Sequence, residues 1–320
     1  NLRGQNNHNR IFGVGDDWQA IYRFTGSDIS LMTNFRKHFG FTRKISLDLT
    51  FRFDNQLADF SGRFILKNPF QLKKKLRVFE EKFEPSVSLY IRSHEENYLD
   101  NILDEIQSAS DTKSSSVFVL ERYNFAIPDE PQQQLIRNKY PGIQSIKWLT
   151  NHSSKGLEAD YVIVGGLYRA VYGFPSEIVD DPLIELLLTG DDQYPHSEER
   201  RLFYVAITRA KRHVYLVAEG GRPSVFIDEI IKDRGYLYRK YGTENSGYAM
   251  CPDCKTGYLI ARDGATGTFY GCSNYPHCEY SENSCPECHT ERLEPDVAKG
   301  ILSCSNCGYQ ARLCPKCKKG

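Results

Sequence analysis

The sequence lacks several features, and each absence excludes a class of protein. Its longest strongly apolar runs, Tyr161–Val164 and Leu186–Leu188, are far shorter than the roughly 20 residues that a membrane span needs. The chain does not begin with methionine, and its polar first residues contain no apolar signal region. We therefore expect a soluble protein without a membrane partner or a visible signal peptide, and we expect the natural sequence to extend upstream of Asn1.

An excess of either charge is also absent. Lysine plus arginine and aspartate plus glutamate each number 41, so net charge alone indicates no polyanionic partner. With 40% hydrophobic residues in a chain of 320, disorder is excluded as the dominant state. The length suits two globular units, or one large unit with an appendage.

Cysteine is missing from the first 250 residues, and all ten cysteines lie between Cys251 and Cys317. Eight of the ten form four Cys-x-x-Cys pairs. Two cysteines at this spacing can present both thiolates to one tetrahedral ion, so the cluster indicates metal binding rather than disulfides. We expect a cytoplasmic protein with a metal-binding tail.

The first 235 residues alternate short apolar runs with stretches of helical period, which is typical of an α/β domain with a largely parallel sheet. The expected strands are Ile11–Val14, Ile45–Leu49, Val87–Ile91, Val117–Leu120, Ser145–Leu149, Tyr161–Gly165 and Val214–Ala218. The expected helices are Ser27–His38, Asn55–Leu66, Glu95–Ala109, Pro131–Lys139, Glu198–Lys211 and Ser224–Arg234. The polar segment Thr243–Gly247 is the expected linker to the tail.

Four polar segments stand next to expected strands, and strand ends are where open α/β sheets hold their ligands. They are Gly13-Val-Gly-Asp-Asp-Trp-Gln-Ala-Ile-Tyr22 with its continuation to Asp28, then Leu49-Thr-Phe-Arg-Phe53, then Leu149-Thr-Asn-His-Ser-Ser-Lys-Gly-Leu-Glu158, and finally Glu198-Glu-Arg-Arg-Leu-Phe-Tyr-Val-Ala-Ile-Thr-Arg-Ala-Lys211. In this order they resemble motifs III, IV, V and VI of the UvrD/Rep-type superfamily 1 DNA helicases. The resemblance spans Gly13 to Lys211 and implies a RecA-like domain of the P-loop NTPase type.

The resemblance implies a role for individual residues. Gln19 would sense the γ-phosphate of ATP, and Arg52 and Arg209 would contact that phosphate from the second RecA-like domain. Phe51, where the family usually has tyrosine, would stack near adenine; Glu158 would bind the ribose, and Gly156 belongs to the same nucleotide-binding loop. Tyr22 and Phe24, the latter usually tryptophan, would contact DNA bases, and Thr150 and His152 would lie on the single strand. We expect Glu199 and Tyr204 to brace the arginine helix.

Two motifs of the family are absent from the sequence. It contains no Gly-x-x-x-x-Gly-Lys-[Ser/Thr], whose backbone and lysine hold the phosphates. The Mg²⁺-binding Asp-Glu-x-x box is missing as well; Asp104-Glu-Ile-Gln107 imitates it, but its apolar neighbours follow helical spacing and predict an ordinary amphipathic helix. We therefore expect that binding of ATP with Mg²⁺ requires a P-loop domain, supplied by an N-terminal part or by a separate chain. We also expect that this chain alone hydrolyses ATP negligibly.

The tail resembles the C-terminal zinc ribbons of bacterial type IA topoisomerases, most clearly in Phe269-Tyr-Gly-Cys-Ser-Asn-Tyr-Pro-His-Cys278. Two zinc ions are expected. The first set is Cys251, Cys254, Cys272 and Cys278, and the second is Cys285, Cys288, Cys304 and Cys307. The role of Cys314 and Cys317 is left open. They form half of an incomplete site, bind a metal together with His289, or replace one of the pairs above. A content of three zinc ions would mean that they complete a site of their own.

These observations divide the chain into four expected parts: residues 1–40, a remnant of the first RecA-like domain with motif III; 41–242, the second RecA-like domain; 248–283, a topoisomerase-type ribbon; and 284–320, a second ribbon. The implied function is the C-terminal part of an ATP-dependent 3′→5′ helicase acting in DNA repair or recombination, with single-stranded DNA and duplex junctions as partners. The alternative is a non-catalytic zinc-ribbon protein that binds single strands beside a degenerate motor half.

Overall fold

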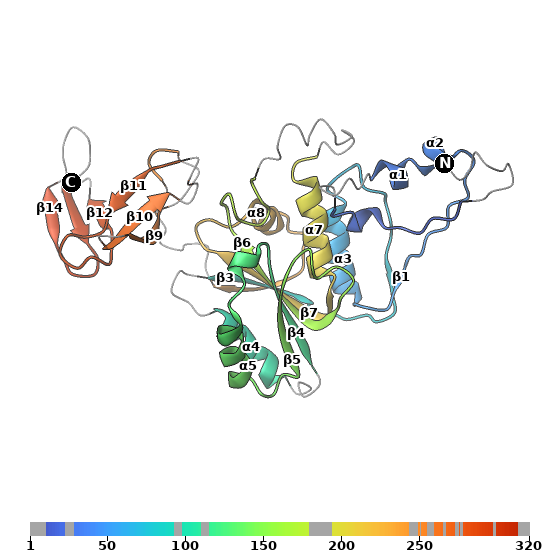
Figure 1. Cartoon of the computed structure of the whole chain (residues 1–320), viewed down its shortest axis with the longest axis horizontal. Helices are drawn as coiled ribbons and strands as arrows, with labels where there is room; N and C mark the ends of the chain where they lie inside the picture. Colours follow the sequence, from blue (N-terminus) through green and yellow to red (C-terminus); the bar gives the residue numbers. More distant parts are fainter. Residues whose placement is uncertain are drawn as a thin grey trace.

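The computed structural model describes residues 11–22, 29–92, 98–109, 115–178, 194–242, 249, 251–254, 259–264, 267–272, 275, 278–296 and 299–312. Phe24, Cys314, Cys317 and the expected linker 243–247 lie outside the described residues. Figure 1 shows an α/β part with the cysteine-rich ribbons at one end of the view and the N-terminal segment at the other.

A six-stranded parallel sheet organises the α/β part, with the strand order β5-β4-β6-β7-β3-β8. In chain order its strands are β3 (Val87–Arg92), β4 (Ser116–Glu121), β5 (Ser145–Thr150), β6 (Ala159–Leu167), β7 (Ala210–Glu219) and β8 (Arg239–Gly242). The inner strands are buried on both faces, which explains their continuous apolar runs. The prediction of an α/β fold with a parallel sheet is therefore confirmed.

Helices cover both faces of this sheet (Figure 1). One face carries α3 (Asn55–Ile65), α7 (Ser197–Ile207) and α8 (Val225–Lys232), and the other carries α4 (Tyr98–Ser108) and α5 (Glu130–Lys139). Each covering group has its own apolar cluster, one around Phe64, Phe203 and Phe226 and the other around Ile102 and Ile106. Side-chain oxygens of Asp54, Asp129 and Ser224 accept backbone hydrogen bonds at the starts of α3, α5 and α8, so these helices begin where the sequence offers a cap.

The remaining elements are short. The N-terminal segment forms the 3₁₀ helix η2 (Asp17–Gln19), α1 (Ser30–Thr33) and α2 (Phe35–Phe39), and β1 (Leu49–Thr50) pairs in parallel with β2 (Arg77–Val78). A further 3₁₀ helix, η5 (Asn124–Ala126), follows β4. The tail contains two three-stranded antiparallel sheets: β9 (Leu259–Gly264), β10 (Gly267–Cys272) and β11 (Ser281–Asn283) in the first, and β12 (Leu293–Asp296), β13 (Ile301–Cys304) and β14 (Gln310–Arg312) in the second.

Five of the seven expected strands are confirmed, and two are wrong. Ile11–Val14 forms no strand, and Phe12 is 91% exposed, because no described segment pairs with this run. Of Ile45–Leu49 only the last residue joins a strand, since its partner β2 is two residues long. The sequence also gave no signal for β8, because Arg239–Gly242 contains neither alternation nor a β-branched residue.

Two expected helices are corrected in extent. Within Ser27–His38, Asn34 leaves helical geometry with φ −108° and ψ 30° and separates α1 from α2. The expected helix Glu198–Lys211 ends at Ile207, because the chain enters β7 at Ala210. The segment Asp104–Gln107 is helical, as expected: it lies in α4, where Ile106 is buried and Glu105 accepts hydrogen bonds from Tyr90 and Tyr215.

Across the described part of the chain, no helix combines the length and the apolar character that a membrane crossing requires.

Candidate functional site

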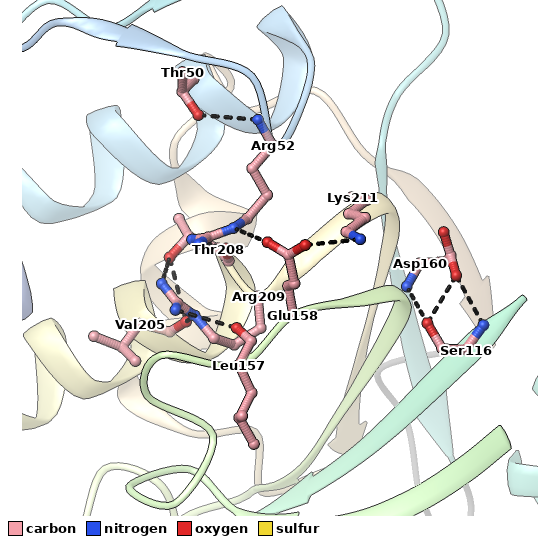
Figure 2. A network of polar contacts seen from close by, with 10 residues as sticks. All are labelled: Thr50, Arg52, Ser116, Leu157, Glu158, Asp160, Val205, Thr208, Arg209 and Lys211. Atoms are coloured by element: carbon pink, nitrogen blue, oxygen red, sulfur yellow. Dashed lines mark hydrogen bonds and ion pairs between the residues drawn. The ribbon is translucent and has the colours of Figure 1, made fainter.

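Three of the residues expected to bind nucleotide, Arg52, Glu158 and Arg209, come together at the amino ends of β6 and β7 (Figure 2). Glu158 directly precedes β6 and Arg209 directly precedes β7, and the neighbouring residues Ala159 and Ala210 are paired across the two strands. Arg52 reaches this point from the turn after β1. Short chain segments thus bring together three side chains that lie up to 157 positions apart.

Arg209 is almost fully buried, at 1% exposure. Its guanidinium donates to the carbonyl oxygen of Val205 at 2.8 Å, to that of Leu157 at 3.3 Å and to the hydroxyl of Thr208 at 3.2 Å. All three acceptors are neutral, and no carboxylate of the described residues forms an ion pair with Arg209. Burial, and then the charge of Arg52, lower the pKa of Arg209 to about 10, so the group stays cationic at neutral pH. A buried cation that has no ion-pair partner among the described residues fits an anionic ligand such as a phosphate.

Arg52 has a carboxylate partner. Its Nε donates to Glu158 Oε2 at 3.1 Å, while Nη1 donates to the carbonyl oxygen of Thr208 at 3.3 Å. Lys211 contacts the other oxygen of Glu158 at 2.8 Å. Hydrogen bonds from Lys211 and Arg52 lower the pKa of Glu158, so this carboxylate is ionised and bridges the two cations (Figure 2).

Gln19 lies in η2, which packs against α7. Its side-chain amide donates to Asp16 Oδ2 at 2.6 Å, and Asp16 also pairs with Lys74 at 2.5 Å. The indole of Trp18 anchors the turn, because it donates to the carbonyl oxygen of Leu72 at 2.9 Å and its ring meets that of Tyr204 edge-on at 5.3 Å. Tyr204 therefore braces the η2 turn from α7, and Asp16, which sequence reasoning did not single out, orients Gln19.

Thr150 ends β5, and His152 lies in the loop that follows. Asn151 is fully buried, and its two side-chain polar atoms have no hydrogen-bond partner among the described residues. The hydroxyl of Tyr22 donates to the carbonyl oxygen of His152 at 3.4 Å, and the two rings lie 6.2 Å apart. Burial, together with the charge of Arg122, lowers the pKa of His152, so this ring is neutral at pH 7. The structure thus places Tyr22 beside the loop expected to hold the single strand.

Two residues complete this loop. The ammonium group of Lys155 stands 4.6 Å from the ring centre of Tyr22, and burial lowers its pKa. Gly156 has φ +85°, a conformation that glycine adopts without the strain a Cβ would bring. Between Thr150 and Glu158 the chain therefore turns back across the sheet, from the carboxyl end of β5 to the amino end of β6.

Phe51 directly precedes Arg52 in the chain and is 73% exposed. Its ring centre lies 5.5 Å from that of Phe79. Its stacking on adenine stays a prediction. Glu199 forms a two-pronged pair with Arg122, with Nη2 to Oε1 at 2.8 Å. It therefore braces α7 against the turn after β4.

A second polar group that sequence reasoning missed lies at the opposite end of the sheet. Glu121 ends β4, and burial raises the pKa of its carboxyl group to about 8. A Cβ on Gly165 would stand 2.2 Å from Glu121 Oε1, so only glycine leaves room for this side chain. Nothing in the pattern of the sequence marks Glu121, because it resembles an ordinary strand terminus.

The described cysteines form the two expected groups. In the first, Cys251 and Cys278 are 3.8 Å apart at Sγ, and Cys254 and Cys272 are 3.6 Å apart. In the second, the pairs Cys285 with Cys307 and Cys288 with Cys304 are each 3.6 Å apart. In each group all four sulfur atoms lie within 4.8 Å of one another. Four thiolates about 2.3 Å from one ion have sulfur atoms about 3.8 Å apart, so both sets fit tetrahedral zinc.

Comparison with known proteins divides the chain in the same way. Residues 126–219 match the family model of the UvrD-like helicase C-terminal domain, and residues 2–40 match that of the UvrD/REP helicase N-terminal domain. Residues 249–287 match the topoisomerase DNA binding C4 zinc finger.

Individual relatives agree with these models. DNA helicase IV of Escherichia coli is 39% identical over 232 residues, which cover 72% of this chain and 33% of the relative. A probable DNA helicase II homolog of Mycoplasma capricolum is 30% identical over 57% of this chain and 21% of its own length. DNA topoisomerase 1 of Campylobacter jejuni is 38% identical over 70 residues, 20% of this chain and 10% of the relative.

The chain spans a third or less of the length of each of these relatives. The matches and the fold nevertheless agree: the α/β part has the fold of a UvrD-like helicase domain, the chain is similar to DNA helicase IV, and a topoisomerase-type zinc ribbon follows.

Proposed function

We propose that this chain supplies the arginine side of the ATP site and part of the single-strand path of an ATP-dependent DNA helicase. The observation that carries the proposal is the buried cation of Arg209, whose hydrogen-bond acceptors are all neutral. Desolvating such a cation costs free energy, and an arriving phosphate would offset that cost. The match to the UvrD-like C-terminal domain over residues 126–219 supports the same assignment.

In this proposal Arg209 and Arg52 face the terminal phosphate of ATP held by a P-loop domain, together with Mg²⁺. Cations in a site closed to water stabilise the negative charge of the phosphoryl group during its transfer. An arginine supplied across a cleft raises the rate of phosphoryl transfer roughly 10³- to 10⁵-fold in well-studied systems. The salt bridge to Glu158 holds Arg52 in place until nucleotide binds. Glu158 would then turn to the ribose, while Gln19, oriented by Asp16, would sense the γ-phosphate.

We further propose that Tyr22, Phe24, Thr150 and His152 contact single-stranded DNA, and that the zinc ribbons add a second contact to the strand or to a duplex junction. The neutral ring of His152 suits a strand that must slide, because it offers hydrogen bonds without a fixed ion pair. Translocation from 3′ to 5′, work in repair or recombination, and a cytoplasmic location are proposals that rest on family resemblance and, for the location, on the reduced thiols that zinc requires.

An ATPase measurement tests the nucleotide role. The chain is joined in frame to a P-loop-bearing half from the same family, and the Arg209→Ala and Arg52→Ala variants are compared with Arg239→Ala, whose side chain pairs with Glu84 away from the cluster. We expect the cluster variants to lose about 10³-fold or more in strand-stimulated ATP turnover, and the control to lose none. Unchanged turnover in both cluster variants would contradict the assignment and would favour a non-catalytic strand-binding protein.

A further inference from the structure

Three aromatic rings to which no role is assigned above form a cluster after the carboxyl ends of β4 and β6. Tyr123 and Phe125 stack with their ring centres 5.1 Å apart and their planes at 11°. Tyr172 meets both rings edge-on, with centres 5.6 Å away in each case. Phe125 is 69% exposed and Tyr172 is 48% exposed, so these two rings are accessible to a ligand.

Polar contacts hold this cluster in place. The hydroxyl of Tyr123 donates to Ser176 Oγ at 2.7 Å, and the backbone N–H of Ser176 donates to Glu199 at 2.9 Å. Glu199 also holds Arg122, whose guanidinium lies 4.8 Å from the ring centre of Tyr123. The two loops that carry the rings are thus tied to each other and to α7. Rigid exposed rings lose little conformational entropy on binding, which favours a ligand site over a loose surface loop.

The cluster continues the proposed path of the single strand. Glu121 and Thr150 are paired at the ends of β4 and β5, and the backbone N–H of Asn151 donates to the carbonyl oxygen of Glu121 at 2.9 Å. Tyr123 follows two residues after Glu121, and the charge of Arg122 acts on His152. A strand that lies on Thr150 and His152 therefore has these rings beside it.

We propose that Tyr123, Phe125 and Tyr172 form a stacking site for an unpaired base of single-stranded DNA. This inference rests on the proposed function and extends its strand path past the loop after β5. Arg122, which lies over the ring of Tyr123, is paired with Glu199, so its charge is largely neutralised and the rings are the main feature of the site. Such a surface suits a base, since every base has a flat face and stacking does not depend on sequence. In duplex DNA those faces are covered by neighbouring bases, so the site selects the unpaired strand.

Photo-crosslinking of the full chain locates the strand directly. The probe is an oligodeoxythymidylate of about 16 nucleotides, which is as long as the larger binding sites of single-strand-binding domains. One thymine at a time is replaced by 5-iodouracil. Peptide mapping should place crosslinks on Phe125 or Tyr172. Crosslinks confined to the loop around Thr150 and His152 would overturn the aromatic site and leave the proposed function standing. The absence of crosslinks from all of residues 11–242 would overturn both the aromatic site and the single-strand path of the proposed function.

A pair of substitutions measures the contribution of the rings. Leucine at both positions, Phe125→Leu with Tyr172→Leu, keeps apolar bulk but removes the ring faces. The matched control is Phe83→Leu, since Phe83 is an exposed ring elsewhere on the surface. We expect the double variant to bind the oligonucleotide about five- to thirty-fold more weakly, and to bind a phosphodiester chain without bases as the wild type does. An affinity for the oligonucleotide equal to that of the wild type would contradict the proposal.

Discussion

The α/β part of the chain encloses two apolar clusters between a six-stranded sheet and its helices, whereas each small sheet of the tail closes around four cysteines. In the α/β part, buried aromatic side chains such as Phe64 and Phe203 supply the core. In the first ribbon the buried cluster consists of Leu259 and three cysteines. A core this small cannot hold a fold without a bound ion, so we expect the two regions to respond to different perturbations.

The same comparison separates their chemistry. The α/β part places a buried arginine, whose hydrogen-bond acceptors are all neutral, at the amino ends of two strands, which suits a ligand with concentrated negative charge. The tail instead adds negative charge when its thiolates bind zinc, so the strand contact proposed for it would depend on other groups. Tyr275 is 55% exposed, and the guanidinium of Arg262 lies 5.5 Å from its ring centre.

The largest expected effect is that of zinc removal. Structural zinc contributes roughly 10–16 kcal/mol in small metal-held folds, so a strong chelator should unfold the ribbons and leave the sheet intact. Hydrogen exchange would show loss of protection in β9 to β14, with β4, β6 and β7 unchanged. Equal loss in both regions would mean that they do not fold independently.

A core truncation tests the other region. Phe64 is fully buried, with its ring 4.6 Å from that of Phe203 and 5.1 Å from that of Phe226. We expect Phe64→Ala to lower the free energy of unfolding of the α/β part by about 3–5 kcal/mol, measured by denaturant titration. Phe83→Ala, at an exposed position, is the control and should change little. Loss of zinc in Phe64→Ala would show that the tail depends on this core.

The buried carboxyl of Glu121 should make the stability of the α/β part depend on pH. Its pKa is about 8 in the folded chain, against an ordinary value of 4.5. Between these two pKa values the folded state therefore holds a proton that the unfolded state releases. The contribution of Glu121 to the free energy of unfolding falls as pH rises from about 5 to 8. In the unchanged chain this fall in the free energy of unfolding should be of the order of 2–4 kcal/mol, and Glu121→Gln should abolish it. The measurement is the free energy of unfolding of both proteins as a function of pH. Parallel profiles would show that Glu121 ionises normally.

The smallest effect is expected at a surface ion pair. Lys139 contacts Asp100 at 2.8 Å and is 55% exposed. Because solvent screens such pairs, Lys139→Gln should cost less than about 1 kcal/mol of unfolding free energy, and high salt should abolish the difference. A loss as large as that of Phe64→Ala would contradict the view that apolar packing holds this region.

Sequence reasoning reached the parallel sheet because its inner strands are buried on both faces and leave an unbroken apolar signal. It failed where tertiary context decides: Ile11–Val14 reads as a strand but has no partner, and β8 reads as a loop but extends the sheet edge. The grouping of Arg52, Glu158 and Arg209 followed from ordered motifs, while their position at the amino ends of β6 and β7 required coordinates. Spacing, together with the resemblance to topoisomerase ribbons, placed the described cysteines in the two groups that the structure shows. Glu121 and the Tyr123 cluster could not be predicted, because burial and ring stacking leave no local pattern.

In the proposed function, Arg52 and Arg209 act on nucleotide while the tail contacts the strand. With the chain joined to a P-loop-bearing half, one experiment compares Arg209→Ala with a variant truncated after Gly242, and measures both ATP turnover at saturating oligodeoxythymidylate and affinity for that strand. Our account predicts that Arg209→Ala abolishes turnover and keeps affinity, whereas the truncation lowers affinity and keeps turnover. If Arg209→Ala turns over ATP at the rate of the unchanged protein, the account is wrong.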